Sequence, residues 1–394
     1  MRLLFLFLLL IGSADVDAQT LQGKVVDEKT AEPIPFTSIG IVGTQISTVT
    51  NENGEFIIKA EKLPLTLRLG HVSYHRTEVL VSEASQSLTI KLSPASISLD
   101  AVEIRPDAGK NLLRSALLLA LDHINDAFYS NAFYRQLTSN NDRPTEIHEL
   151  FYDLNWNVKH VKGWAAKQSR FAELNDPSKF TLRNQSFLTF AIAGYIFPDK
   201  KGQYVSLKYL DDYEIEIDRI IEQNDQDIAV ITCKLKKSKK RQFFVNSTYY
   251  VGFGDRKVYR VENKIYNLAL DLSPNLKLRF PPIVETIATF NGSNQAIPTL
   301  ESMSTKMHLA LSTGGREFTS VISSLLTVFK IDDKLKNQQF RSVNSSVTDK
   351  AVIESIKYDP LFWKNNPIVK QTTLEDAFIK MMESKQAFGT MTNP

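Results

Sequence analysis

Three residues near the start of the chain have the types and spacing of metal ligands: His71, His75 and Glu78. The pair His75-x-x-Glu78 has a spacing that zinc hydrolases use, and imidazole and carboxylate groups are common zinc ligands. The surrounding sequence alternates like a β-strand, in which positions four apart lie about 13 Å from each other. Positions three apart point to opposite faces of the sheet. Because the ligands of one zinc ion must converge, we expect ordinary strand or loop histidines here and no metal site.

The sequence contains no other recognisable catalytic pattern. Cys233 is the only cysteine, which rules out an intramolecular disulfide and a multi-cysteine metal site. It lies in an apolar, strand-like segment, so we expect a buried, unreactive thiol. His148-Glu149 lacks the second histidine of a metalloprotease helix, and there is neither a Gly-x-Ser-x-Gly motif nor a P-loop. We therefore predict no catalytic residue, no metal ligand and no cofactor.

The densest basic cluster follows the strand-like segment that contains Cys233. One interpretation is contact with anionic lipid headgroups or with an acidic partner surface. The other is a solvated hairpin tip whose first lysines form cross-strand pairs with Asp212 and Glu214. The residues assigned to a contact of the first kind are Lys236, Lys237, Lys239, Lys240 and Arg241.

An acidic row precedes that cluster, at Asp212, Glu214, Glu216 and Asp218. Carboxylates bind calcium, but neighbours on one face of a strand are about 6.6 Å apart. Four such residues form a stripe and do not enclose an ion, so we expect no calcium site.

Length and composition describe a globular protein of two or three domains. The chain has 394 residues, of which 43% are hydrophobic and 23% charged. Its 47 basic and 44 acidic side chains give a net charge of +3, which provides no case for a nucleic-acid partner.

The first 18 residues have the features of a secretory signal peptide. A basic residue precedes a short leucine-rich run, and small residues precede a cleavage site between Ala18 and Gln19. The apolar run is too short to span a bilayer as a helix. No cysteine follows it, so we do not expect a lipoprotein. An exported protein without disulfides is typical of a bacterial envelope, and we predict a location in the periplasm or at the outer membrane.

Residues 21–93 predict a seven-stranded β-sandwich. Seven short strand-like runs are separated by clusters of Gly, Pro, Asn and Asp. Gly54 closes a hairpin connection in which a residue with positive φ is favourable. The predicted strands are 21–27, 36–42, 46–50, 55–60, 65–71, 77–82 and 87–92.

The same residues carry a family resemblance. The ordered motifs resemble the carboxypeptidase regulatory-like domain, a transthyretin-like sandwich common at the start of exported Bacteroidetes proteins. That domain holds no catalytic residues, so the resemblance implies a scaffold or docking module at residues 19–95. The motifs are Gln22–Asp27, Glu32–Phe36, Gly43-Thr44, Thr48–Phe56, Leu69–Tyr74 and Leu88–Leu92.

The segment after the sandwich is similar to two kinds of envelope protein. Ser98–Pro106 resembles the strand that follows this domain in TonB-dependent receptors. Such a receptor needs about 220 residues for its membrane strands alone, before plug and loops, and the remaining chain is too short. The chain is also similar to Bacteroidetes proteins in which the sandwich precedes an uncharacterised envelope domain. The residues that carry this similarity are Phe128-Tyr129, Asn131–Arg135, Tyr358–Lys364 and Thr372–Glu375.

Residues 96–394 predict an α+β domain. Apolar residues at helical spacing indicate a helix at 107–125, and another helix is expected at 374–384. Residues 203–330 are strand-rich, and one long antiparallel sheet with a polar face is the simplest arrangement. The sequence leaves the fold of residues 126–202 open. The chain as a whole is predicted to be mainly β with some α.

The function expected from these observations is that of a non-enzymatic cell-envelope protein with a docking module. Its partner would be an envelope protein or a glycan, and it would associate with the outer membrane or remain in the periplasm. Two alternatives stay open from the sequence. One is a zinc-dependent hydrolase or carboxypeptidase-associated protein, suggested by His75-x-x-Glu78, and the other is a small outer-membrane β-barrel built from residues 203–330.

Overall fold

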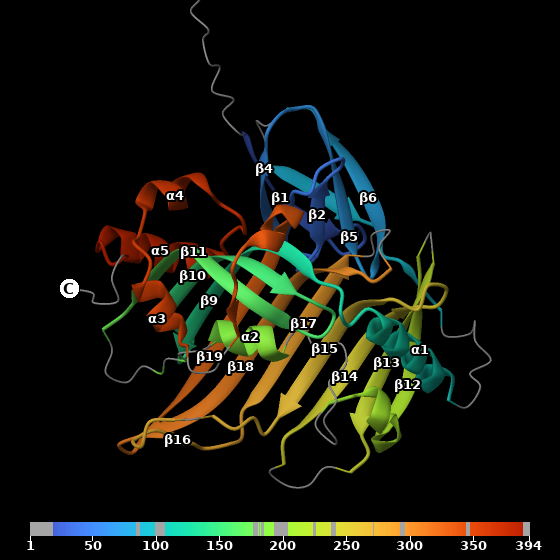
Figure 1. Cartoon of the computed structure of the whole chain (residues 1–394). Coiled ribbons are helices and arrows are strands. Elements are labelled where there is room, and N and C mark those ends of the chain that lie inside the picture. Colours follow the sequence, from blue (N-terminus) through green and yellow to red (C-terminus); the bar gives the residue numbers. More distant parts are fainter. Residues whose placement is uncertain are drawn as a thin grey trace, which may run out of the picture.

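The computed structural model (Figure 1) describes most of the chain after the predicted signal peptide. The described residues are 19–83, 87–98, 107–175, 180, 182, 185–192, 204–223, 226–237, 242–270, 272–291, 296–343 and 347–388. Residues 1–18, including Ala18, and the basic residues Lys239, Lys240 and Arg241 lie outside this set. None of the helices in the described ranges is both long and apolar enough to cross a membrane.

The N-terminal part is a sandwich of two small sheets, as predicted. One sheet has the strand order β4-β1-β7 and the other has the order β3-β2-β5-β6. Their facing side chains form a separate apolar core that includes Val25, Ile39 and Phe56. The strands are β1 (Gln19–Asp27), β2 (Ser38–Ile41), β3 (Ser47–Val49), β4 (Glu55–Ala60), β5 (Leu65–His71), β6 (Tyr74–Val81) and β7 (Leu88–Leu92).

Local sequence explains most of these strand boundaries. The predicted hairpin connection places Gly54 at φ +71°, and a Cβ atom there would lie 2.6 Å from the carbonyl oxygen of Val25. The strand β6 begins at Tyr74, earlier than the predicted Thr77, because a tight turn after β5 pairs Tyr74 with His71.

The C-terminal part is built on one large antiparallel sheet of thirteen strands. Twelve of them follow the order β20-β11-β10-β9-β19-β18-β17-β15-β14-β13-β12-β8, and β16 pairs with β18. Most neighbours are joined by hairpins, which confirms the predicted long antiparallel sheet. The strands are β8 (Ser96–Ser98), β9 (Phe128–Asn140), β10 (Arg143–Trp156), β11 (Val161–Glu173), β12 (Tyr213–Glu222), β13 (Asp227–Leu235), β14 (Phe244–Gly252), β15 (Val258–Tyr266), β16 (Lys277–Leu278), β17 (Ile283–Asn291), β18 (Thr299–Thr313), β19 (Arg316–Ile331) and β20 (Arg341–Ser342).

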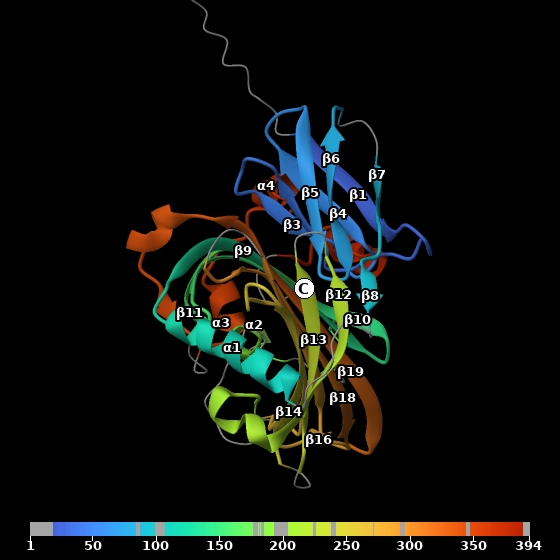
Figure 2. The ribbon, with the colours of Figure 1, turned by 90° about the vertical axis from the view of Figure 1, so that its right-hand side faces the viewer.

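The sheet has two differently covered faces. We call the face that carries Tyr134 and Tyr152 the inner face, and the face that carries Arg135 and Glu149 the outer face. Figure 2 shows α1, α2 and α3 together on one side of the sheet, where their apolar residues join the main core of the inner face. The helices are α1 (Ala108–Asp122), α2 (Gln185–Ile192), α3 (Asp349–Glu354), α4 (Pro360–Asn365) and α5 (Thr373–Ser384), with 3₁₀ turns at Leu207–Asp212 and Asp333–Asn337.

The outer face is covered in part by the C-terminal helices. A capping box at Thr372 and Glu375 starts α5, and Phe378 and Met382 pack on Ile147 of β10. Trp363 of α4 packs against Phe151 on the same face, with ring centroids 5.3 Å apart. These contacts bring the end of the chain against strands far away in sequence.

A buried ion network ties this C-terminal segment to the sheet. Glu149 of β10 accepts a hydrogen bond from Arg135 Nε at 2.6 Å and another from Arg170 Nε. Arg135 also donates to the carbonyl oxygen of Val369 at 3.2 Å and lies 3.4 Å from the Glu375 carboxylate. Burial opposes ionisation of Glu149 most strongly, yet the two guanidinium groups together lower its pKa.

The sandwich is fixed to the larger part by several direct contacts. Ser38 donates to the carboxylate of Glu301 at 2.6 Å, and Thr48 donates to the carbonyl oxygen of Ile368 at 2.8 Å. Gln223 donates to the carbonyl oxygen of Val72 at 2.8 Å. The strand β8, at the predicted domain boundary, pairs with β12 of the large sheet. The two parts therefore form one continuous structure, and the sandwich does not hang on a free linker.

Candidate functional site

The residues with metal-ligand spacing do not converge. Glu78 forms an ion pair with Arg68 at 2.8 Å across the β5–β6 hairpin. His71 accepts a hydrogen bond from the Ser73 backbone through Nδ1, at 3.2 Å. Among the described residues there is no group of three or more His, Cys, Asp or Glu side chains that could hold a metal ion.

Other residues singled out in the sequence are also engaged in the sheet. Cys233 is fully buried, and burial raises the pKa of its thiol. In the acidic row, Glu214 pairs in register with Lys234 across β12 and β13, and Asp218 forms an ion pair with Arg219. In the basic cluster, Lys236 donates to the carbonyl oxygen of Asp211 at 3.0 Å. Lys237 is exposed.

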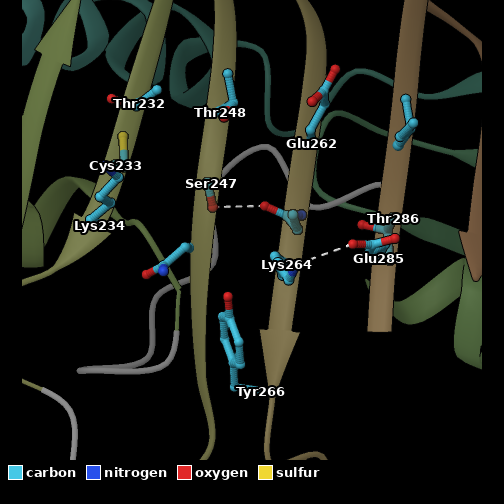
Figure 3. A pocket seen from close by; sticks show the side chains of 13 residues that line it. Thr232, Cys233, Lys234, Ser247, Thr248, Glu262, Lys264, Tyr266, Glu285 and Thr286 are labelled. Carbon is cyan, nitrogen blue, oxygen red and sulfur yellow. Dashed lines mark hydrogen bonds and ion pairs between the residues drawn. The ribbon is translucent and has the colours of Figure 1, made fainter. Parts of the chain in front are cut away.

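An open groove of about 430 Å³ crosses the four adjacent strands β13, β14, β15 and β17 (Figure 3). Hydroxyl, amide, ammonium and carboxylate groups line it. Some belong to the buried residues Ser247, Asn263 and Thr286, and the others belong to residues that alternate with these along the strands. The lining side chains that point outward from the sheet include Thr232, Lys234, Asn246, Thr248, Glu262, Lys264, Tyr266 and Glu285.

Two stacked aromatic rings lie at one end of this groove. Phe244 and Tyr266 are paired in register on β14 and β15, and their ring centroids are 4.6 Å apart with an interplanar angle of 13°. The neighbouring Asn246 has a fixed amide orientation, because its Oδ1 atom accepts from the Leu235 backbone at 3.0 Å. The stacked pair thus adjoins an oriented hydrogen-bonding group.

The two carboxylates of the groove each have a basic partner. Lys264 and Glu285 form an ion pair at 3.3 Å. Glu262 accepts from Arg260 Nε at 2.7 Å and from the Tyr250 hydroxyl at 3.1 Å. Each of these two carboxylates therefore has a partner of its own, and Figure 3 shows the contact between Lys264 and Glu285 as a dashed line.

The sandwich borders the groove through Arg260. The Nη1 atom of Arg260 lies 3.5 Å from Nε2 of His71, which projects from the β5–β6 hairpin. Burial, with a smaller contribution from the Arg260 charge, lowers the pKa of His71 to about 3. His71 is therefore neutral near pH 7 and packs beside the guanidinium group without charge repulsion. His71, which the sequence offered as a metal-ligand candidate, thus packs against Arg260, the hydrogen-bond donor of Glu262.

The groove was not predicted from the sequence. Its residues extend from position 232 to position 287, and each resembles an ordinary solvent-facing residue of an amphipathic strand. The available signal was weak: aromatic residues at 244 and 266 occupy positions where outward-facing polar residues would be usual. Only the strand register brings these two residues together.

A match to a known protein family covers the N-terminal domain. Residues 21–104 match the model of the CarboxypepD_reg-like domain family, so this part of the chain is such a domain. No curated protein sequence matches the chain.

Two solved structures show weak similarity to the chain. One is the LolA superfamily protein NE2245 from Nitrosomonas europaea, with 14% identity and a TM-score of 0.22 over 58% of this chain and 96% of that one. The other is MucB in complex with MucA(peri), with 9% identity and a TM-score of 0.16 over 59% and 98% of the two chains. These scores are too low to establish a common fold.

Proposed function

We propose that this protein is an exported, non-enzymatic protein of a Bacteroidetes-type cell envelope that binds a glycan in the outer groove. The observation that carries the proposal is the stacked pair Phe244–Tyr266 beside the polar groove. The leucine-rich N-terminus and the regulatory-like domain support export and an envelope location.

The chemistry of the groove suits a sugar. Sugar rings present apolar C–H faces that pack on flat aromatic side chains, which bury large apolar surfaces at little conformational cost. Their hydroxyl groups both donate and accept, and the groove offers both functions through Thr232, Thr248 and Asn246. The ion pair Lys264–Glu285 adds a donor and an acceptor side by side at the sheet surface. An open groove of this kind favours an extended polar ligand over a small apolar one.

The arrangement of the carboxylates favours binding over glycoside hydrolysis. A glycosidase needs two carboxyl groups that flank one bond, one of them with a raised pKa for proton donation. Here Glu262 is held by Arg260 and Tyr250, and Glu285 is held by Lys264. Because each carboxylate has its own cation, the two support ligand contacts better than concerted acid–base chemistry.

In this proposal the regulatory-like domain acts as a support for the groove. His71 contacts Arg260, and Arg260 orients Glu262 at the groove wall. The resemblance implies a scaffold without catalytic residues, and these contacts give the scaffold a specific task.

Replacing Tyr266 with alanine tests the proposed site. The mature chain is screened against bacterial envelope polysaccharides, and the affinity for the best ligand is measured by titration calorimetry. The Tyr266→Ala variant is expected to bind roughly tenfold more weakly, because the stacked platform is lost. Phe280→Ala is the matched control, since this ring is exposed on a different part of the surface. The absence of any glycan binding, or equal affinity of Tyr266→Ala and the parent chain, would refute the proposal.

A further inference from the structure

At one end of the large sheet, several strands end in connections that lie away from the sandwich. These connections carry exposed apolar and basic side chains that do not line the groove. We call this region the distal rim and define it by the described residues of the connections after β13 (236, 237, 242 and 243), β15 (267–270 and 272–282) and β18 (314 and 315), with Arg316 and Glu317 at the start of β19. Asn267 donates to the carbonyl oxygen of Gln242 at 2.8 Å and so joins the first two connections. Arg279 donates its backbone N–H to Ala310 at 2.9 Å and forms an ion pair with Glu317 at 2.8 Å, which joins the second to the third. Figure 1 shows β16 at this end of the sheet, far from the blue sandwich.

The distal rim exposes apolar side chains. Phe280 is 62% exposed, and Ile283 at the start of β17 is 38% exposed. Between them, Pro281 and Pro282 restrict the backbone, so Phe280 is presented without a large loss of conformational freedom. The described part of this connection therefore carries an exposed aromatic ring on a stiff backbone.

Basic side chains surround this phenylalanine. Lys277, Arg279 and Arg316 are exposed on the second and third connections, and Lys236 and Lys237 are exposed on the first. The guanidinium group of Arg279 lies 5.6 Å from the Phe280 ring centroid. Three acidic residues lie close by, Glu317, Asp211 and Asp212, of which Glu317 and Asp211 have the basic partners Arg279 and Lys110. The described part of the rim therefore presents an excess of positive charge around an apolar tip.

We propose that the distal rim binds the surface of an anionic lipid bilayer. Phe280 enters the interfacial layer, where an aromatic ring is favourable, while Lys277, Arg316 and their neighbours contact lipid phosphates. An acidic protein would be attracted by the same charges, but it would have no need for a projecting, stiffened phenylalanine. The lipid surface uses both features, and the groove on the outer face is formed by different side chains. The proposal is therefore independent of glycan binding.

Flotation with lipid vesicles tests this surface with the mature full-length chain. Vesicles contain either phosphatidylcholine alone or equal parts of phosphatidylcholine and phosphatidylglycerol. We expect binding only to the anionic vesicles, and we expect high salt to weaken it because salt screens the charges. The double variant Lys277→Gln/Arg316→Gln is expected to bind on the order of 20-fold more weakly, since each basic residue near the surface contributes about fivefold. Phe280→Ser is expected to lower binding roughly tenfold at every salt concentration.

Matched controls separate the rim from general effects. Leu80→Ser changes a side chain of similar exposure (67%) on the sandwich, and Lys336→Gln changes an exposed lysine in the 3₁₀ turn that follows β19. Both controls, and Tyr266→Ala, are expected to bind anionic vesicles like the parent chain. Absence of binding to anionic vesicles at low salt would overturn the proposal, as would parent-like binding of both rim variants. Binding to polyglutamate but not to vesicles would assign the rim to an acidic macromolecule instead.

Discussion

Replacing Glu149 with leucine is expected to lower the free energy of unfolding by about 3–5 kcal/mol. The carboxylate is almost completely inaccessible, and it is the shared partner of Arg135 and Arg170. Without it, two guanidinium groups remain buried next to an apolar side chain, and neither can regain water without opening the structure. The cost arises from the two uncompensated charges rather than from the volume of the new side chain.

The side chains around Arg170 hold its guanidinium group in place, so it cannot easily move to water. Its guanidinium carbon lies 4.6 Å from the ring centroid of Trp363 and 5.1 Å from that of Phe388. These aromatic faces attract the cation but cannot replace the hydrogen bonds of a carboxylate. Because Trp363 and Phe388 belong to the C-terminal segment, we expect that segment to loosen first in the Glu149→Leu variant.

Urea denaturation followed by tryptophan fluorescence measures this effect. The triple variant Arg135→Met/Glu149→Leu/Arg170→Met is expected to recover much of the loss, because an apolar cluster can replace a buried ion network. Glu285→Leu is the control, since it breaks only the exposed ion pair with Lys264 and should cost at most about 1 kcal/mol. A Glu149→Leu variant as stable as the Glu285→Leu variant would contradict the assigned role of the network.

Replacing Glu301 with glutamine is expected to stabilise the protein above pH 7. Burial at the junction raises the pKa of Glu301 to about 7, against smaller opposing effects of the Ser38 hydrogen bond and the Arg76 charge. Glutamine resembles the protonated acid and keeps an oxygen that can accept from Ser38. At pH 8 the native glutamate must carry a poorly solvated charge, and the variant avoids this cost.

The pH window follows from the sign of this pKa change. A folded-state pKa above the ordinary value of 4.5 means that the acid contributes stability fully below about pH 4.5. That contribution disappears as the pH rises to about 7, and its size is at most about 3 kcal/mol. Parent and variant should therefore have equal stability near pH 4 and differ by up to that amount at pH 8.

Urea midpoints across this pH range test the prediction through the difference between the two proteins. The contribution of His71 to the stability of the protein changes with pH in the opposite direction. Its folded-state pKa of about 3 lies below the ordinary value of 6.5, so this contribution is lost as the pH falls below 6.5. Since both proteins contain His71, the difference between them isolates Glu301. An unchanged difference from pH 4 to pH 8 would show that Glu301 does not titrate in this range.

The sandwich could be predicted because each of its strands and turns is recognisable from its own residues. Short strands with one buried face show alternation, as in β4, where Phe56, Ile58 and Ala60 are buried and the residues between them are not. Gly54 marks the sharpest hairpin connection directly in the sequence.

The strands β9, β10 and β11 escaped prediction for a physical reason. Both of their faces are covered, by α2 and α3 on one side and by α4 and α5 on the other. Consequently β10 is buried at almost every position, and it includes the charged Glu146 and Glu149. Alternation disappears when both faces are buried, and such a segment has no clear period of two.

The groove could not be predicted because it depends on how separate strands are paired, which no single segment of the sequence shows. The stacked pair Phe244–Tyr266 exists because two strands adopt one register out of several possible ones. The basic cluster after Cys233 was visible in the sequence, but the position of its described members Lys236 and Lys237 at the same end of the sheet as Phe280 was not. Both the groove and the distal rim are therefore formed by pairing between strands that are distant in sequence.

The pairing of β8 with β12 has a consequence for any shortened form of the protein. β8 covers the edge of β12 at Ile220 and Ile221, and beside it Ala95 and Val72 pack on Val230 and Tyr250. A fragment that begins after β8 would present an unpaired strand edge next to a bare apolar patch, which is a template for self-association into aggregates. Removal of the sandwich together with β8 is therefore expected to leave an aggregation-prone remnant, because the start of the chain covers both the strand edge and the apolar patch.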